Sequence, residues 1–309
     1  MNEQATRYPE GRKQILTRHS PGGILPHGIL IISTTLAMLL TMSAFTVSCS
    51  VIESIFGEAE VTSGISFRKD GDWQVDSVDL FIFRDEEIRT LEYHCRLPYR
   101  DPSVESVSDT VRLSKGMKVA VAAANLKGIP DESKLESYET MELMRSEYIY
   151  DDPERPVMSG ITVFRAGDGC EVDLRPLLCT IILSEVNNNM TGYRRLEDPR
   201  CYLENVNADA ELFRETGFRP TEIINRTQAV PLPCDVGLYT QYPSSHLYCY
   251  PNDSQESTVG TPRTNFVLEC EINGVTRCFS TELPPLARGC SHTVELTVNS
   301  PEDYRFRVF

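Results

Sequence analysis

Apolar and polar residues alternate along most of this chain, and the alternation predicts its secondary structure. Residues 61–67 and 75–83 alternate with a period of two, which is typical of a strand that buries one face. The second of these stretches ends as a nearly continuous apolar run, which indicates a central strand. Residues 117–124 and 177–186 are almost continuously apolar, as in a strand buried on both faces. About a dozen such runs, separated by polar turns, predict an all-β chain of sandwich architecture.

One stretch, residues 131–144, does not follow the period of two. Its apolar residues, among them Tyr138 and Met141, recur at helical spacing, and Asp131 or Ser133 is suited to begin a helix as its N-cap. We therefore expect one short helix packed over the first half of the β-structure.

The dipeptide Asn273-Gly274 lies between two apolar runs and predicts a hairpin with a two-residue turn. That turn would place Cys270 opposite Arg277 and Cys278 opposite Glu269. The two sulfurs would then point to opposite faces of the hairpin, because side chains alternate along a strand. We expect no disulfide between these two cysteines.

The N-terminal part of the chain has the pattern of an export signal. Residues 28–50 carry no charge, follow four basic residues and contain Cys49 at their end. This order is typical of a bacterial lipoprotein signal, in which residues 1–48 are removed and a lipid is attached to Cys49. Thr46 stands where such signals usually have Leu, so an uncleaved membrane anchor and ordinary signal cleavage stay open. All three alternatives place the chain from Val51 onward outside the cytoplasm.

The remaining chain is long enough for two small domains or one large one. Residues 49–60 are rich in glutamate and are interpreted as a tether. Arg175-Pro176 precedes the most apolar run and is a candidate hinge. We therefore predict an N-terminal domain over residues 61–175 and a C-terminal domain over 176–309.

The net charge of the chain limits the kinds of molecule that it can bind. The chain has a formal net charge of −15, and residues 1–48 hold four basic and two acidic side chains, which leaves −17 on the remainder. Nucleic acid is therefore excluded as a partner, because phosphate binding requires a basic surface. A solvated acidic surface in the external medium is the plainer interpretation.

Groups that catalyse reactions or bind metals are sparse. His94, His246 and His292 do not have the spacing of metal ligands. The acidic run 151–154 lacks the alternation and the glycine of a calcium loop. The chain contains no GxSxG motif, P-loop or dinucleotide fingerprint. We expect no metal, no cofactor and no enzymatic activity.

Cysteine is frequent for a chain that is exported. Nine cysteines follow Cys49, which is an odd number, and none of them forms a CxxC pair. An exported chain invites disulfides, yet many of these residues are also suited to be small buried apolar side chains. The disulfide pattern stays open.

Tyrosines cluster with prolines late in the chain. We interpret this cluster as a possible binding surface for sugars or for a protein partner, with a looped edge of the β-structure as the alternative. The four tyrosines are Tyr239, Tyr242, Tyr248 and Tyr250.

Several motifs together give the chain a resemblance to a known family. They are Cys49, the segment VDSVDLFIFRD (75–85), the run 119–125 that ends in Ala-Asn, PVMSG (156–160), VDLR (172–175) followed by an apolar run, and LPPLARG (283–289). In these motifs the chain resembles the fimbrillin-A-associated anchor and accessory proteins of Bacteroidota type V fimbriae. The family usually has Asp at the place of Arg84 and Gly near Glu87, which leaves anchor, accessory and tip subunits open.

The resemblance implies two transthyretin-like, Greek-key β-sandwich domains, with one short helix in the first, carried on an outer-membrane lipoprotein with a palmitate-type anchor at the cell surface. It also implies a role in fimbrium assembly and cell adhesion, with other fimbrial subunits as partners and with host or bacterial surface ligands as open candidates. Such subunits join by strand exchange, in which an extended segment of one subunit completes a sheet of the next.

In stalk subunits of this kind an arginine-specific protease removes an N-terminal strand, and Arg68 is the possible cleavage site here. Cleavage after Arg68 would indicate a polymerising subunit, whereas a retained strand would indicate an anchor. A glycan-binding surface lipoprotein of a nutrient uptake system is the alternative function, with Tyr239 to Tyr250 as its sugar platform. An exported hydrolase is a third hypothesis.

Overall fold

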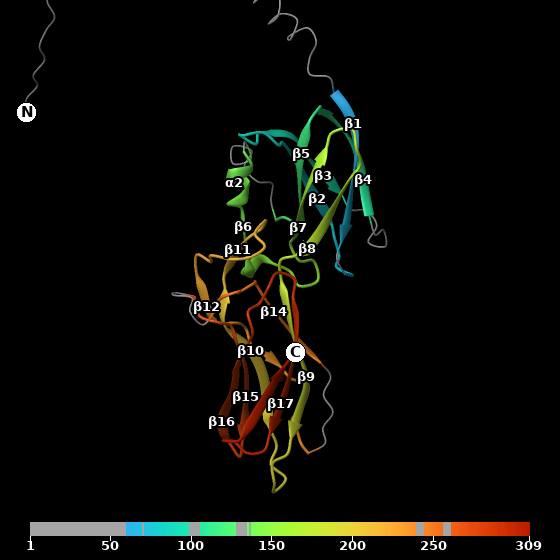
Figure 1. The fold of residues 1–309 in the computed structure, drawn as a ribbon. Coiled ribbons are helices and arrows are strands. Elements are labelled where there is room, and N and C mark those ends of the chain that lie inside the picture. Colours follow the sequence, from blue (N-terminus) through green and yellow to red (C-terminus); the bar gives the residue numbers. More distant parts are fainter. Residues whose placement is uncertain are drawn as a thin grey trace, which may run out of the picture. The chain divides into compact units, whose positions relative to one another are not determined.

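The computed structural model describes residues 60–69, 71–98, 106–127, 135, 137–238, 244–255 and 261–309. Within these residues the chain is almost entirely β-structure with one short α-helix, which confirms the all-β prediction (Figure 1). Ala59–Phe309 forms one compact unit. The expected signal segment 1–48 and Cys49 lie outside the described residues.

The first part of this unit is a seven-stranded sheet in the order β3-β2-β5-β7-β8-β1-β4. Strands β7 and β8 pair only at Met158 and Ser159, so the sheet divides there. Apolar residues from both sides of the division, such as Leu80 and Ile65, belong to one core cluster. The strands are β1 (Glu60–Lys69), β2 (Ser77–Arg84), β3 (Leu91–Pro98), β4 (Ser106–Ser114), β5 (Met117–Ala124), β7 (Met158–Arg165) and β8 (Cys170–Pro176).

The helix α2 (Tyr138–Glu142) packs over the opposite face of β2 and β5. There Phe81 and Val121, which have no exposed surface, lie in one cluster with Leu135 and Met141. Strands β2 and β5 are therefore buried on both faces, as their continuous apolar runs predict.

The helix begins later than the sequence pattern indicates. Its N-cap is Ser137, whose hydroxyl accepts a hydrogen bond from the backbone N–H of Thr140 at 3.4 Å. The expected N-caps, Asp131 and Ser133, lie outside the described residues.

The second part of the unit contains a five-stranded and a four-stranded sheet. Their strand orders are β12-β10-β15-β16, with β13 beside β10, and β14-β9-β17-β18. Residues of both sheets, such as Leu203 of β10 and Leu296 of β17, share one apolar core cluster. The strands are β9 (Cys179–Asn188), β10 (Glu197–Asn207), β12 (Ile223–Arg226), β13 (Val230–Pro231), β14 (Ser245–Cys249), β15 (Asn265–Ile272), β16 (Val275–Glu282), β17 (Ser291–Val298) and β18 (Tyr304–Val308).

The predicted hairpin is confirmed in its register. Cys270 faces Arg277 and Glu269 faces Cys278 in the β15–β16 ladder. Asn273 has a φ of 52° and Gly274 a φ of 72°, as a two-residue turn of this kind requires. Cys270 is buried, whereas Cys278 is exposed on the other face.

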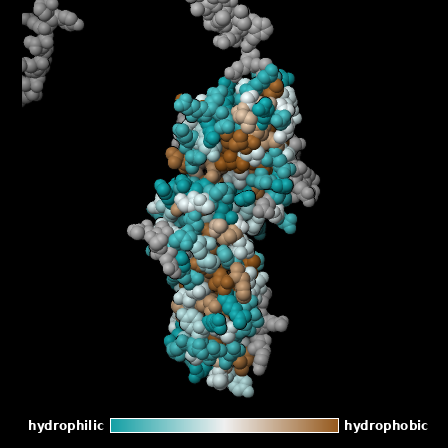
Figure 2. All heavy atoms as spheres, in the orientation of Figure 1, coloured by the Kyte–Doolittle hydropathy of each residue, from teal (hydrophilic) through white to brown (hydrophobic). Residues whose placement is uncertain are grey.

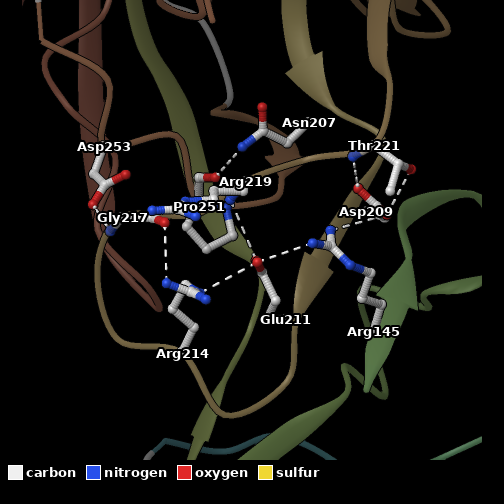
Figure 3. A network of polar contacts seen from close by, with 10 residues as sticks. All are labelled: Arg145, Asn207, Asp209, Glu211, Arg214, Gly217, Arg219, Thr221, Pro251 and Asp253. Atoms are coloured by element: carbon white, nitrogen blue, oxygen red, sulfur yellow. Dashed lines mark hydrogen bonds and ion pairs between the residues drawn. The ribbon is translucent and has the colours of Figure 1, made fainter. Parts of the chain in front are cut away.

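A short two-stranded sheet of β6 (Arg145–Glu147) and β11 (Asp209–Glu211) holds a network of buried charges. Figure 3 shows Arg145 between two carboxylates, with N–O distances of 3.1 Å to Asp209 and 2.9 Å to Glu211. The hydroxyl and N–H of Thr221 also donate to Asp209, and Arg214 lies 3.2 Å from Glu211. Both carboxylates are almost fully buried, so each depends on these partners.

Arg288 joins three further segments through its buried guanidinium. It donates to the carbonyl oxygens of Leu212, Ser159 and Arg175, at 2.8, 3.2 and 3.0 Å. Burial lowers the pKa of Arg288 to about 10, which still leaves it charged at neutral pH. The LPPLARG motif therefore contains a residue, Arg288, that fixes the turn before β17 to β7 and β8.

Apolar side chains are also exposed on the first sheet. Met117 of β5 and Ile161 and Val163 of β7 have exposed fractions of 42%, 38% and 53%. Figure 2 shows apolar side chains gathered on the face where Figure 1 draws these strands. This surface lies beside the helix-covered cluster, because Val121 pairs with Ile161 and Val119 with Val163.

Candidate assembly strand and binding cleft

Strand β1 is held on both sides by other strands. It pairs antiparallel with β4 and parallel with β8, so Phe67 faces Val107 on one side and Val172 on the other. The predicted alternation is present, since Ile65 and Phe67 have no exposed surface. The strand therefore contributes both backbone hydrogen bonds and core side chains to this sheet.

Removal of β1 would open a groove between β4 and β8. Residues of these two strands, such as Val111 and Val172, belong to the same core cluster as Ile65 and Phe67. Burying one side chain of this size stabilises a fold by about 2–3 kcal/mol. An open edge with apolar walls favours the binding of an extended strand with alternating apolar residues.

Arg68, the possible cleavage site, lies within the ladder rather than in a loop. It pairs with Ser106 in β4, and the next residue, Lys69, pairs with Leu174 in β8. Its guanidinium forms ion pairs with Glu171 at 3.1 Å and Asp173 at 2.6 Å, while 59% of its side chain stays exposed. A protease needs an accessible extended segment, so cleavage here requires the end of β1 to open locally.

The four tyrosines of the expected binding surface differ in where the structure places them. Tyr239 and Tyr242 lie outside the described residues. Tyr250 has no exposed surface and donates its hydroxyl to Asp151 at 3.0 Å, so it is a core residue and its place on a binding surface was predicted wrongly. Burial raises the pKa of Tyr250 further above its usual range. Tyr248 is half-buried and lines a cleft.

This cleft has a volume of about 680 Å³, within the usual range for small-molecule sites. Tyr148, of the single-turn 3-10 helix η2 (Tyr148–Tyr150), lines it together with Tyr248 and His246 of β14. Asp151 and Arg226 bring opposite charges to its wall. Aromatic rings beside hydrogen-bonding groups can bind a sugar or an extended peptide.

Burial shifts the titration of two groups at this cleft. It raises the pKa of Asp151, although hydrogen bonds from Val157 and Tyr250 act in the opposite direction. It also raises the pKa of Tyr148 to about 12. The hydroxyl of Tyr148 donates a hydrogen bond to the carbonyl oxygen of Tyr248 at 2.9 Å. This bond fixes Tyr148 and Tyr248 relative to each other in the wall of the cleft.

The histidines and the acidic run have structural contacts. His94 stacks on Phe81 with a centroid distance of 4.5 Å, and His292 lies 3.1 Å from the carbonyl oxygen of Phe309. Asp152 accepts a hydrogen bond from the N–H of Glu154 at 3.0 Å, which orders the turn. Among the described residues no group of three or more His, Cys, Asp or Glu side chains is placed to hold a metal ion.

Most of the residues that line the cleft carry no recognisable signal in the sequence. They come from η2, β12 and the 227–231 segment, which are far apart in the sequence and have no shared motif. The tyrosine cluster was the only signal, and it led to one lining residue, Tyr248. No helix among the described residues is long and apolar enough to cross a membrane.

Solved structures with a similar fold exist, although no family model and no curated protein matches the chain. A protein from Parabacteroides distasonis assigned to cell adhesion has a TM-score of 0.63 at 11% identity, over 80% of this chain and 96% of its own. Fimbrilin from Porphyromonas gingivalis has a TM-score of 0.56 at 10% identity, over 80% and 96%. The C-terminally truncated tip fimbrial protein Mfa3 of that organism has a TM-score of 0.53 at 11% identity, over 81% of this chain and 99% of its own. At such identities the likeness shows the fold alone.

Proposed function

We propose that this chain is a cell-surface fimbrial subunit of the anchor or accessory type, which works in fimbrium assembly and cell adhesion. In this proposal a lipid on Cys49 holds it to the outer membrane, residues 49–60 form the tether, and the domains 61–175 and 176–309 are β-sandwiches. The fold shared with fimbrial and cell-adhesion proteins supports the proposal. The names of those neighbours refer to fimbriae and cell adhesion, in agreement with a structural role.

Retention of β1 in the mature protein would favour an anchor over a polymerising stalk subunit. The strand is paired on both sides and buries Ile65 and Phe67 completely. A subunit that keeps this strand has no open groove at this position, so it cannot accept a donor strand there. It can still contribute an extended segment to a neighbouring subunit, which places it at one end of the fimbrium.

Resistance of β1 to proteolysis tests this choice. We expect an arginine-specific protease to leave the Arg68–Lys69 bond of the folded full-length chain, purified in detergent, largely intact. Phe67→Ala should accelerate cleavage at this bond at least tenfold, because losing a buried phenylalanine destabilises its surroundings by about 3–5 kcal/mol and each 1.4 kcal/mol corresponds to a factor of ten in local opening. Appearance of a new N-terminus at Lys69, measured by mass spectrometry over time, gives the rate.

Thr62→Ala is the matched control, since Thr62 lies on the exposed face of the same strand. It should leave the cleavage rate close to that of the wild type. If the wild type is cut at Arg68 as quickly as Phe67→Ala, β1 is not retained, and the chain is a polymerising subunit instead.

The cleft beside Tyr248 favours one alternative function, a glycan-binding surface lipoprotein of an uptake system. It has the size and the aromatic and polar lining that a sugar site requires. A glycan array with the full-length chain and with Tyr248→Ala separates the two functions. Sugar binding that the variant loses, without any association with fimbriae, would replace the fimbrial proposal with this one.

A further inference from the structure

Three cysteines meet at one end of the four-stranded sheet. Cys179 is the first residue of β9 and lies directly opposite Cys249, the last residue of β14. On the other side of β9, Cys290 comes immediately before β17, whose first residue Ser291 pairs with Thr180. The N–H of Thr180 donates to the carbonyl oxygen of Cys290 at 2.9 Å. The strands β14, β9 and β17 are neighbours, so these cysteines stand side by side.

The thiol of Cys179 interacts with both of the others. Its side chain has hydrogen bonds with Cys249 and with Cys290, and its Sγ donates to the carbonyl oxygen of Ala287 at 3.0 Å. Backbones of paired strands are about 4.5–5.5 Å apart, within the range that a disulfide spans. Three thiols of which the middle one contacts both others allow one disulfide at a time.

Solvent exposure distinguishes the two disulfides that this cluster could form, Cys179–Cys290 and Cys179–Cys249. Cys179 and Cys249 have no exposed surface, whereas Cys290 is only partly buried, in the turn closed by its N–H to the carbonyl of Ala287. A disulfide forms through a mixed disulfide, so the oxidant must first reach a thiol. Cys290 is the member of this cluster that an external disulfide can reach.

We propose that Cys179 and Cys290 form a disulfide in the exported protein, while Cys249 stays a buried thiol. The oxidant is a disulfide of a thiol-exchange protein or of a small thiol, RSSR. The sulfur of Cys290 attacks RSSR and releases one RSH, and the sulfur of Cys179 then displaces the second RSH. Two thiols and RSSR thus give one protein disulfide and two RSH, with one pair of electrons passing to RSSR.

The hydrogen bond between the two thiols, followed by burial, raises the pKa of Cys290 above its usual range. The pKa of Cys179 is also raised, chiefly by its hydrogen bond with Cys249. Since the thiolate is the reactive form, the disulfide should form slowly at neutral pH and faster as the pH rises. Once formed, it closes a long loop and fixes the turn that carries Arg288 to the start of β9.

The occurrence of this disulfide in cells rests on the proposed export, but its geometry does not, and the test separates them. The full-length chain in detergent is incubated with oxidised glutathione, its remaining thiols are alkylated, and peptides are mapped without reduction. We expect a Cys179–Cys290 linkage, its loss in Cys290→Ser, and its persistence in Cys249→Ala. The oxidised chain should melt about 10 °C higher than the reduced one.

The exposed Cys234 provides a control, because Cys234→Ser should leave the linkage unchanged. A wild-type map without a Cys179–Cys290 peptide, or with Cys179 linked to Cys249, would overturn the pairing. If the linkage forms with glutathione but the chain from native membranes holds both thiols reduced, the claim for the exported protein fails. Association with fimbriae is measured independently of either result.

Discussion

Arg145→Met is expected to lower the free energy of unfolding by about 3–5 kcal/mol, because it leaves two buried carboxylates without their shared cation. Asp209 and Glu211 have exposed fractions of only 5% and 2%, and both lie about one hydrogen-bond length from the guanidinium. Methionine has similar length and no charge, so the variant removes the charge and its donors while keeping most of the packing. Urea denaturation of the purified chain measures the loss.

Arg155→Met is the matched control for this prediction. Arg155 pairs with Asp76 at 3.0 Å, but about half of each side chain is exposed. Exposed pairs of this kind contribute about 0–1 kcal/mol. Replacing Asp209 and Glu211 by their amides in the Arg145→Met chain should recover part of the stability, since neutral groups are less costly to bury. Equal losses for Arg145→Met and Arg155→Met would show that the buried network is not a major source of stability.

Gly160→Ala is expected to destabilise the first sheet by about 3 kcal/mol, through a clash that no side chain can relieve. A Cβ at Gly160 would lie 2.1 Å from the carbonyl oxygen and 2.9 Å from the carbonyl carbon of Asp173. Both are backbone atoms of β8, so β8 or β7 has to move. Gly160 comes directly after Met158 and Ser159, the two residues at which β7 pairs with β8. A melting temperature lower by about 10 °C is the expected reading.

Gly64→Ala controls for the general effect of adding a methyl group to a strand glycine. Gly64 lies in β1 of the same sheet, and a Cβ there would meet no atom within 4 Å. Its melting temperature should stay the same or rise slightly, because alanine restricts the unfolded chain. If Gly160→Ala and Gly64→Ala have the same melting temperature, the approach of β8 to Gly160 does not constrain the sheet.

The sequence predicts the local β-structure well because periodicity records which face of a strand is buried. The alternation at Ile65 and Phe67 and the register of Cys270 against Arg277 both follow from local spacing alone. The helix over the first sheet is also predicted, although its N-cap is Ser137. PVMSG was visible as a motif, but the reason for its glycine is the backbone of Asp173.

What the sequence does not predict depends on contacts between distant segments. The parallel pairing of β1 with β8 joins Ile65 to Cys170, and no local pattern records which strands become neighbours. Tyr248 and Tyr250 have the same residue type and lie two positions apart, yet one lines a cleft and the other is buried. The partner of Asp209 and Glu211, Arg145, likewise comes from a separate element. In the sequence alone these two residues therefore cannot be told from ordinary surface acids.

The proposal of a lipid-anchored fimbrial subunit is tested most directly by the intact mass and N-terminus of the chain isolated from its native outer membrane, with and without Cys49→Ala. We expect a chain that begins at Cys49 and carries acyl groups, and we expect the variant to be lost from the membrane and released to the medium. A chain that begins near Met1 would contradict lipid anchoring, and one that begins at Lys69 would contradict the anchor role and indicate a polymerised subunit.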